Sequence, residues 1–66
     1  MSVAKTIELV ASSTVSFDDA VKQGIARGTQ TLDQVKGAWV QDHEVVVENG
    51  NITEYRVRLK LTFVLR

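Results

Sequence analysis

The dipeptide Asn49-Gly50 stands between two long runs rich in apolar residues, and it is the strongest local signal in the sequence. A two-residue type I′ turn needs positive φ at both central positions, which Asn and Gly tolerate better than other residues do. The pair therefore predicts a β-hairpin with strands in residues 37–47 and 54–66. In a regular hairpin around this turn, three facing pairs are expected: Trp39 with Lys60, Gln41 with Arg58 and His43 with Arg56.

Residues 54–66 alternate in character, as a half-buried strand does. The odd positions are apolar or aromatic from Tyr55 to Leu65, whereas the even positions include Arg56, Arg58 and Lys60. Successive side chains of a strand point to opposite faces, so the odd positions belong to a core and the even positions to a second face. The same second face is expected to include five apolar residues: Val10, Val45, Val47, Ile52 and Val64.

The N-terminal half predicts one strand followed by one helix. Residues 3–11 alternate in a pattern typical of a half-buried strand. Ser16 can accept a hydrogen bond from the backbone N–H of Asp19, and the acids at 18 and 19 favour the positive end of a helix dipole, so a helix should begin near Phe17. Its apolar stripe, spaced by three and four, comprises Phe17, Val21, Gly24, Ile25, Gly28 and Leu32.

Gly24 and Gly28 lie on one face of this predicted helix. Each costs the helix about 1 kcal/mol relative to Ala, so a compensating contact is expected. We predict that the helix backbone approaches the sheet closely at these two positions. A phosphate-binding loop is the functional alternative, but the sequence GIARG falls within a helical period and not at a turn from strand to helix.

The length of the chain predicts one domain, residues 1–66, that needs further stabilisation. A domain this short buries only about 60% of the surface that its unfolded chain exposes. There is no Cys and only one His, so a disulfide and a Cys-based or single-histidine zinc site are excluded. Self-association remains, and the uncovered second face and an unpaired edge of the long C-terminal strand would both favour it.

Charge and composition exclude several classes of function. Eight acids balance eight bases, so nucleic acid and membrane surfaces are not expected partners, although Trp39 beside the cations could stack on single-stranded bases. No signal peptide is evident and no run reaches the roughly 18 apolar residues of a membrane span. The absence of Cys fits a cytoplasmic location. His43 has no adjacent nucleophile, so we do not expect an enzyme.

The order strand, helix, long strand, long strand within 66 residues resembles the dodecin family. The resemblance covers the segments IELVASS, SFDDAVKQGIARGTQTL and VENGNITEYRVRLKLTFVL. It implies an α+β fold, β-α-β-β, with a three-stranded antiparallel sheet wrapped around one helix. It also implies that twelve copies form a hollow homododecamer. Many dodecins bind flavins, which stack in pairs between tryptophans at subunit interfaces.

The resemblance implies a set of cofactor-binding positions: Gly37, Trp39, Gln41, Asp42 and Arg56. Gly37 occupies the position of the family's stacking Trp, and Trp39 follows two residues later, about 6 to 7 Å along the same face of the strand. Arg56 occupies the position of the Gln that meets the flavin's pyrimidine edge. Asp42 retains the acid that approaches the ribityl chain.

Two functions are therefore expected from the sequence. The first is a binding and storage protein that sequesters riboflavin, FMN or FAD at subunit interfaces. The alternative is a structural or cation-binding assembly without flavin, since one branch of the family is associated with calcium. No metal site is expected within one chain, although symmetry could bring together copies of Asp42, Glu44 and Glu48. For Arg56, pairing with Glu44, Glu54 or a neighbouring chain is an alternative to ligand binding.

Overall fold

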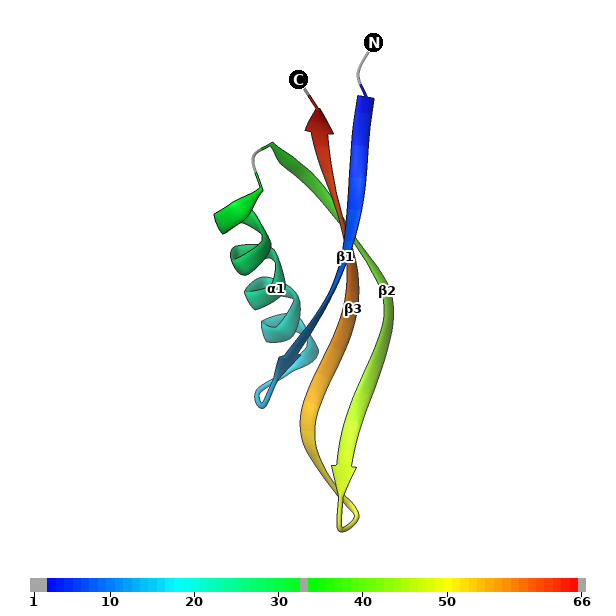
Figure 1. The fold of residues 1–66 in the computed structure, drawn as a ribbon. Coiled ribbons are helices and arrows are strands. Elements are labelled where there is room, and N and C mark those ends of the chain that lie inside the picture. Colours follow the sequence, from blue (N-terminus) through cyan, green and yellow to red (C-terminus); the bar gives the residue numbers. More distant parts are fainter. Residues whose placement is uncertain (1–2, 33, 66) are drawn as a thin grey trace.

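The computed structural model describes residues 3–32 and 34–65, which form four elements in the order β-α-β-β (Figure 1). These elements are β1 (Val3–Ser13), α1 (Phe17–Thr31), β2 (Val35–Glu48) and β3 (Asn51–Leu65). The strands form one antiparallel sheet, and α1 lies against one face of it. The predicted α+β class is confirmed. The β2-β3 hairpin extends well past the N-terminal end of α1, and the molecule is elongated, at 51 × 19 × 14 Å.

The sheet order is β1-β3-β2, so β3 is the central strand. The expectation that the long C-terminal strand has an unpaired edge is therefore wrong, because β3 pairs with β1 on one side and with β2 on the other. The two outer strands, β1 and β2, carry the edges of the sheet. In the described part of the chain, no helix has the length and apolar character needed to cross a membrane.

Helix α1 begins where the sequence predicts. Ser16 is the N-cap residue, and its Oγ accepts a hydrogen bond of 3.0 Å from the backbone N–H of Asp19. Asp18 and Asp19 occupy the first turn. The nearby Ser13 was not predicted to take part: it is buried, and its hydroxyl donates to Asp19 Oδ2 at 2.6 Å. This bond ties the end of β1 to the beginning of the helix.

The core lies between α1 and the odd positions of β3. Val57, Leu59 and Leu61 are fully buried there. A Cβ on Gly24 would lie 2.7 Å from Leu59 Cδ1, and one on Gly28 would lie closer still to Leu61 Cδ1. The two glycines therefore permit the close approach of helix and sheet that the sequence predicts.

The turn is as expected, with φ of 52° at Asn49 and 78° at Gly50, but the hairpin register is irregular. The register shifts between Val46 and Val47, between Val40 and Asp42, and again between Val35 and Gly37. The first shift leaves Thr53 as an extra residue on β3, and the second leaves Gln41 as an extra residue on β2. Such bulges move every pairing between them by one position.

Two of the three expected facing pairs are consequently wrong. Trp39 does face Lys60, as predicted. The remaining pairs lie between the first two bulges, where the facing residues are Asp42 with Arg58, His43 with Val57 and Glu44 with Arg56. Because of the bulges, Arg58 faces the carboxylate of Asp42 and not the amide of Gln41. Arg56 likewise faces the carboxylate of Glu44 and not the imidazole of His43.

Candidate functional site

The candidate site lies on the outer face of the sheet, which we define as the face turned away from α1. Trp39 projects from β2 onto this face and is 64% exposed, the largest apolar side chain left open to solvent among those described. The Nζ atom of its cross-strand neighbour Lys60 lies 5.6 Å from the centroid of the indole ring. This is within the range of a cation–π contact. Trp39 therefore offers an aromatic platform with an ammonium group beside it.

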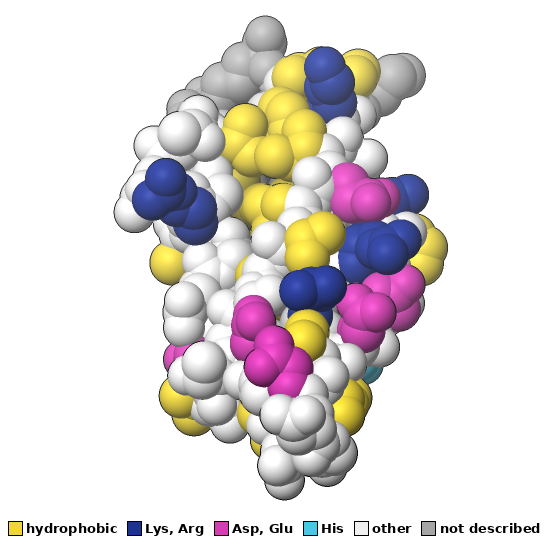
Figure 2. Space-filling view, turned by 60° about the horizontal axis from the view of Figure 1, so that its bottom comes forward, with side chains coloured by type: hydrophobic (Ala, Val, Ile, Leu, Met, Phe, Trp, Pro, Cys, Tyr) yellow, Lys and Arg dark blue, Asp and Glu magenta, His cyan; other side chains and the backbone are white. Residues whose placement is uncertain are grey.

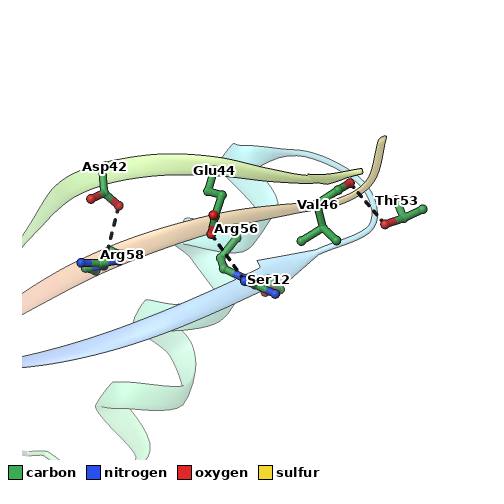
Figure 3. A network of polar contacts seen from close by, with 7 residues as sticks. All are labelled: Ser12, Asp42, Glu44, Val46, Thr53, Arg56 and Arg58. Atoms are coloured by element: carbon green, nitrogen blue, oxygen red, sulfur yellow. Dashed lines mark hydrogen bonds and ion pairs between the residues drawn. The ribbon is translucent and has the colours of Figure 1, made fainter. Parts of the chain in front are cut away.

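A strip of paired charges continues along the outer face from Trp39 towards the hairpin turn (Figure 3). Arg58 Nε lies 3.8 Å from Asp42 Oδ1, and Arg56 Nη1 lies 3.4 Å from Glu44 Oε1. Arg56 Nε also donates to Ser12 Oγ of β1 at 3.4 Å, so this guanidinium group connects all three strands. The contact with Glu44 confirms one of the partners considered for Arg56. Ser12 was missed because its position depends on the pairing of β1 with β3.

The same side chains surround a shallow hollow of about 170 Å³. Its lining combines one apolar residue of β1 with the two ion pairs: Val10, Asp42, Glu44, Arg56 and Arg58. Val10 faces Arg58 and is well exposed, which confirms its predicted place on the outer face. Figure 2 shows acidic and basic side chains clustered together beside a strip of hydrophobic ones. The hollow is therefore polar but close to neutral in charge.

Gln41 occupies the bulge between Trp39 and Asp42. Its Oε1 atom is buried and has no hydrogen-bond partner among the described residues. A buried polar atom without a partner costs about 1 to 3 kcal/mol, so a donor from outside the chain would stabilise this site.

Gly37 lies in an exposed part of β2, where it faces Thr62. No heavy atom lies within 4 Å of the position that a Cβ would take at Gly37. The position is therefore open, in contrast to the two buried helix glycines.

His43 does not belong to the outer face, contrary to expectation. Its ring packs edge to face against Phe17, with 4.7 Å between the centroids, and Phe17 also contacts Tyr55 at 5.2 Å. Val45 faces Tyr55, so it too lies on the helix side of the sheet and not on the predicted face. Both corrections follow from the bulges at Gln41 and Thr53, because shifting the register by one residue turns a side chain to the other face.

The described residues form no cluster of three or more His, Asp or Glu side chains able to hold a metal ion. The outer-face carboxylates of Asp42 and Glu44 each lie beside an arginine. Calcium takes six to eight oxygen ligands, which is more than these two side chains can supply. A cation site would thus require several copies of the chain.

Comparison with known proteins gives one family. The family model described as Dodecin matches residues 3–66. A calcium dodecin from Mycobacterium tuberculosis is 27% identical over 66 residues, which cover 100% of this chain and 93% of that protein.

Solved structures agree with this match. Dodecin from Streptomyces coelicolor superposes with a TM-score of 0.93 at 29% identity, covering 98% of this chain and 93% of that one. The structure of the M. tuberculosis calcium dodecin, described as a calcium-chelating antigen with a novel calcium-binding site, gives 0.84 at 28% identity, covering 97% and 91%.

Proposed function

Because the chain belongs to the dodecin family, we propose that it is a flavin-binding storage protein that assembles as a hollow homododecamer. Dodecins are binding proteins and not enzymes, and they assemble as dodecamers. We propose further that residues 1–66 act as one domain and that flavin is held between subunits on the outer face of the sheet. The ligand would be riboflavin, FMN or FAD.

The observation that carries the proposal is the exposed indole of Trp39 beside a polar strip. A flavin has a flat aromatic ring system with hydrogen-bonding groups along one edge. Trp39 offers a surface for stacking, and exposed side chains of this size rarely remain uncovered in an assembly. A second copy of the chain would cover the other side of the ligand, as stacking between tryptophans requires.

The neighbouring residues take definite roles in this proposal. Arg56 donates to the pyrimidine edge, after giving up part of its contact with Glu44, and Asp42 accepts from the ribityl chain. Gln41 supplies an amide whose oxygen lacks a partner among the residues that the structure describes. Gly37 leaves room beside Trp39, because no heavy atom lies within 4 Å of its Cβ position.

Calcium binding without flavin is the second candidate function. It is supported by the relative named calcium dodecin and by the outer-face carboxylates of Asp42 and Glu44. Those carboxylates are engaged by arginines in the single chain, so a calcium ion would have to displace these contacts. We therefore place this function second.

Assembly is tested by native mass spectrometry. Twelve copies of a 7.3 kDa chain give about 88 kDa. We expect this mass at micromolar concentration, because a domain of this size is only marginally stable alone. A stable folded monomer under the same conditions would contradict the proposed assembly.

Flavin binding is tested by titrating riboflavin and FMN with the protein and following flavin fluorescence, which stacking on Trp39 should quench. Loss of one aromatic platform costs about 1 to 3 kcal/mol in base stacking, so Trp39→Ala should weaken binding by roughly tenfold or more. Trp39→Phe is the matched control, because it keeps an aromatic ring.

One result would decide against flavin. Unchanged flavin fluorescence at tens of micromolar ligand with an intact dodecamer would remove the flavin proposal. Calorimetric titration of the metal-stripped protein with calcium would then test the second candidate.

A further inference from the structure

Lys60 differs from the other cations of the outer face in its partner. Arg56 and Arg58 each lie within 4.0 Å of a carboxylate, whereas the ammonium of Lys60 lies over the ring of Trp39. Its cross-strand neighbour on β1 is Glu8, but no ion pair joins these two described side chains within that distance. Of the three described cations Arg56, Arg58 and Lys60, Lys60 is therefore the one without a carboxylate within 4.0 Å.

The position of Lys60 also places it in the way of a stacked ligand. It lies on the central strand, directly across from Trp39, with Nζ 5.6 Å from the indole centroid. A flat ring that stacks on this side of Trp39 must displace the ammonium group. The displaced cation loses its contact with the indole and needs another partner.

We infer that Lys60 is a specificity-determining residue that favours an aromatic ligand carrying a phosphate, such as FMN, over an uncharged one, such as riboflavin. This inference rests on the proposed function. A phosphate monoester carries a charge of about −1.5 to −2 at pH 7 and would give the displaced ammonium a strong partner. Riboflavin displaces the same ammonium and offers no anion in return.

The arginines and acids nearby do not remove this preference. Asp42 and Glu44 are each beside an arginine, so together the two pairs add little net charge to the hollow. Glu8 is the remaining acid opposite Lys60 and competes with a phosphate for its ammonium. The preference should thus be moderate and should weaken as salt screens the charges.

The test compares the dissociation constants of riboflavin and FMN for the assembled protein and for its Lys60→Gln variant, at low ionic strength. The attraction between two unit charges about 4 Å apart in water corresponds to about a fivefold change in affinity. A phosphate carries more than one unit of charge. We expect wild-type protein to bind FMN about five- to tenfold more tightly than riboflavin.

In Lys60→Gln the affinities for the two ligands should change differently. FMN should bind less tightly because its phosphate has lost a partner, and riboflavin should bind as tightly or more tightly because it no longer displaces a cation. Lys60→Arg should retain the preference for FMN. Lys22→Gln, on the exposed side of α1, is the matched control and should leave both constants unchanged.

Several outcomes would overturn the inference. Equal binding of both flavins by the wild-type protein, or a preference for FMN that persists in Lys60→Gln, would remove the role of Lys60 and leave flavin binding standing. A parallel loss of both ligands in Lys60→Gln would indicate a structural role. Absence of binding by either flavin would overturn the proposed function and this inference with it.

Discussion

Glu44 lies directly across the β2-β3 strand pair from Arg56, with 3.4 Å between Glu44 Oε1 and Arg56 Nη1. The side chains remain 63% and 40% exposed, respectively. Ion pairs exposed to this degree contribute about 0 to 1 kcal/mol to stability, because water screens the attraction and two long side chains lose freedom. The contact therefore fixes where the guanidinium points more than it stabilises the chain.

Arg56→Gln should consequently change the free energy of unfolding by less than about 1 kcal/mol. The measurement is urea unfolding at matched protein concentrations, since assembly contributes to apparent stability. Arg58→Gln, which removes the longer contact with Asp42, is the matched control and should behave in the same way. A loss of about 3 kcal/mol or more in Arg56→Gln would instead mean that assembly buries the pair, leaving Glu44 as an uncompensated charge.

Gly28→Val should destabilise the protein by about 1 to 3 kcal/mol through overpacking. The added Cβ would meet Leu61 Cδ1, and Leu61 is fully buried, so its side chain has no solvent into which to move. Thermal unfolding measures the effect.

The same substitution at Gly37 provides the control for this experiment. There the Cβ meets nothing within 4 Å, and a β-branched residue is favourable in a strand, so Gly37→Val should be neutral or stabilising by up to about 1 kcal/mol. Should Gly28→Val melt at or above the wild-type temperature, the close approach of α1 to the sheet would not be a constraint.

Gly50→Ala should cost about 1 to 2 kcal/mol, because Gly50 has φ of 78° and a Cβ is unfavourable in this region. Open space around the position means that the cost comes from the backbone and not from a clash. Asn49→Gly keeps positive φ accessible and should be close to neutral. Chemical denaturation of both variants separates the two cases, and a Gly50→Ala variant of wild-type stability would contradict the predicted turn energetics.

Local signals in the sequence were sufficient for several features of the fold. Ser16 as the N-cap and the turn at Asn49-Gly50 are each decided within a few residues of the chain. They could be predicted because the relevant hydrogen bonds and backbone angles involve near neighbours. The close packing at Gly28 is a contact with the distant Leu61, and it could be predicted because two glycines on one helix face need a compensating contact. The alternation of β3 likewise identified Val57, Leu59 and Leu61 as core positions.

The partners of the outer-face cations could be predicted only where the hairpin is regular. Trp39 was correctly placed opposite Lys60, because the bulges at Thr53 and Gln41 displace the register in opposite senses and cancel before that pair. His43 lies between the two bulges, and it was therefore assigned to the wrong face. The sequence does not locate the bulge at Gln41, because residues 41–44 are all polar and their pattern does not show which of them face the core.

The amino-acid sequence by itself determined the elements, their order, the capped helix and the tight turn, because these depend on interactions between residues close along the chain. The tertiary structure alone decided that β3 is central, that Ser12 meets Arg56 and that Asp42 and Glu44 face the arginines. These features depend on how a sheet curves around α1 and where it inserts a bulge to do so. The curvature of the sheet and the positions of its bulges depend on the free energy of the whole packed sheet, and no single residue determines them.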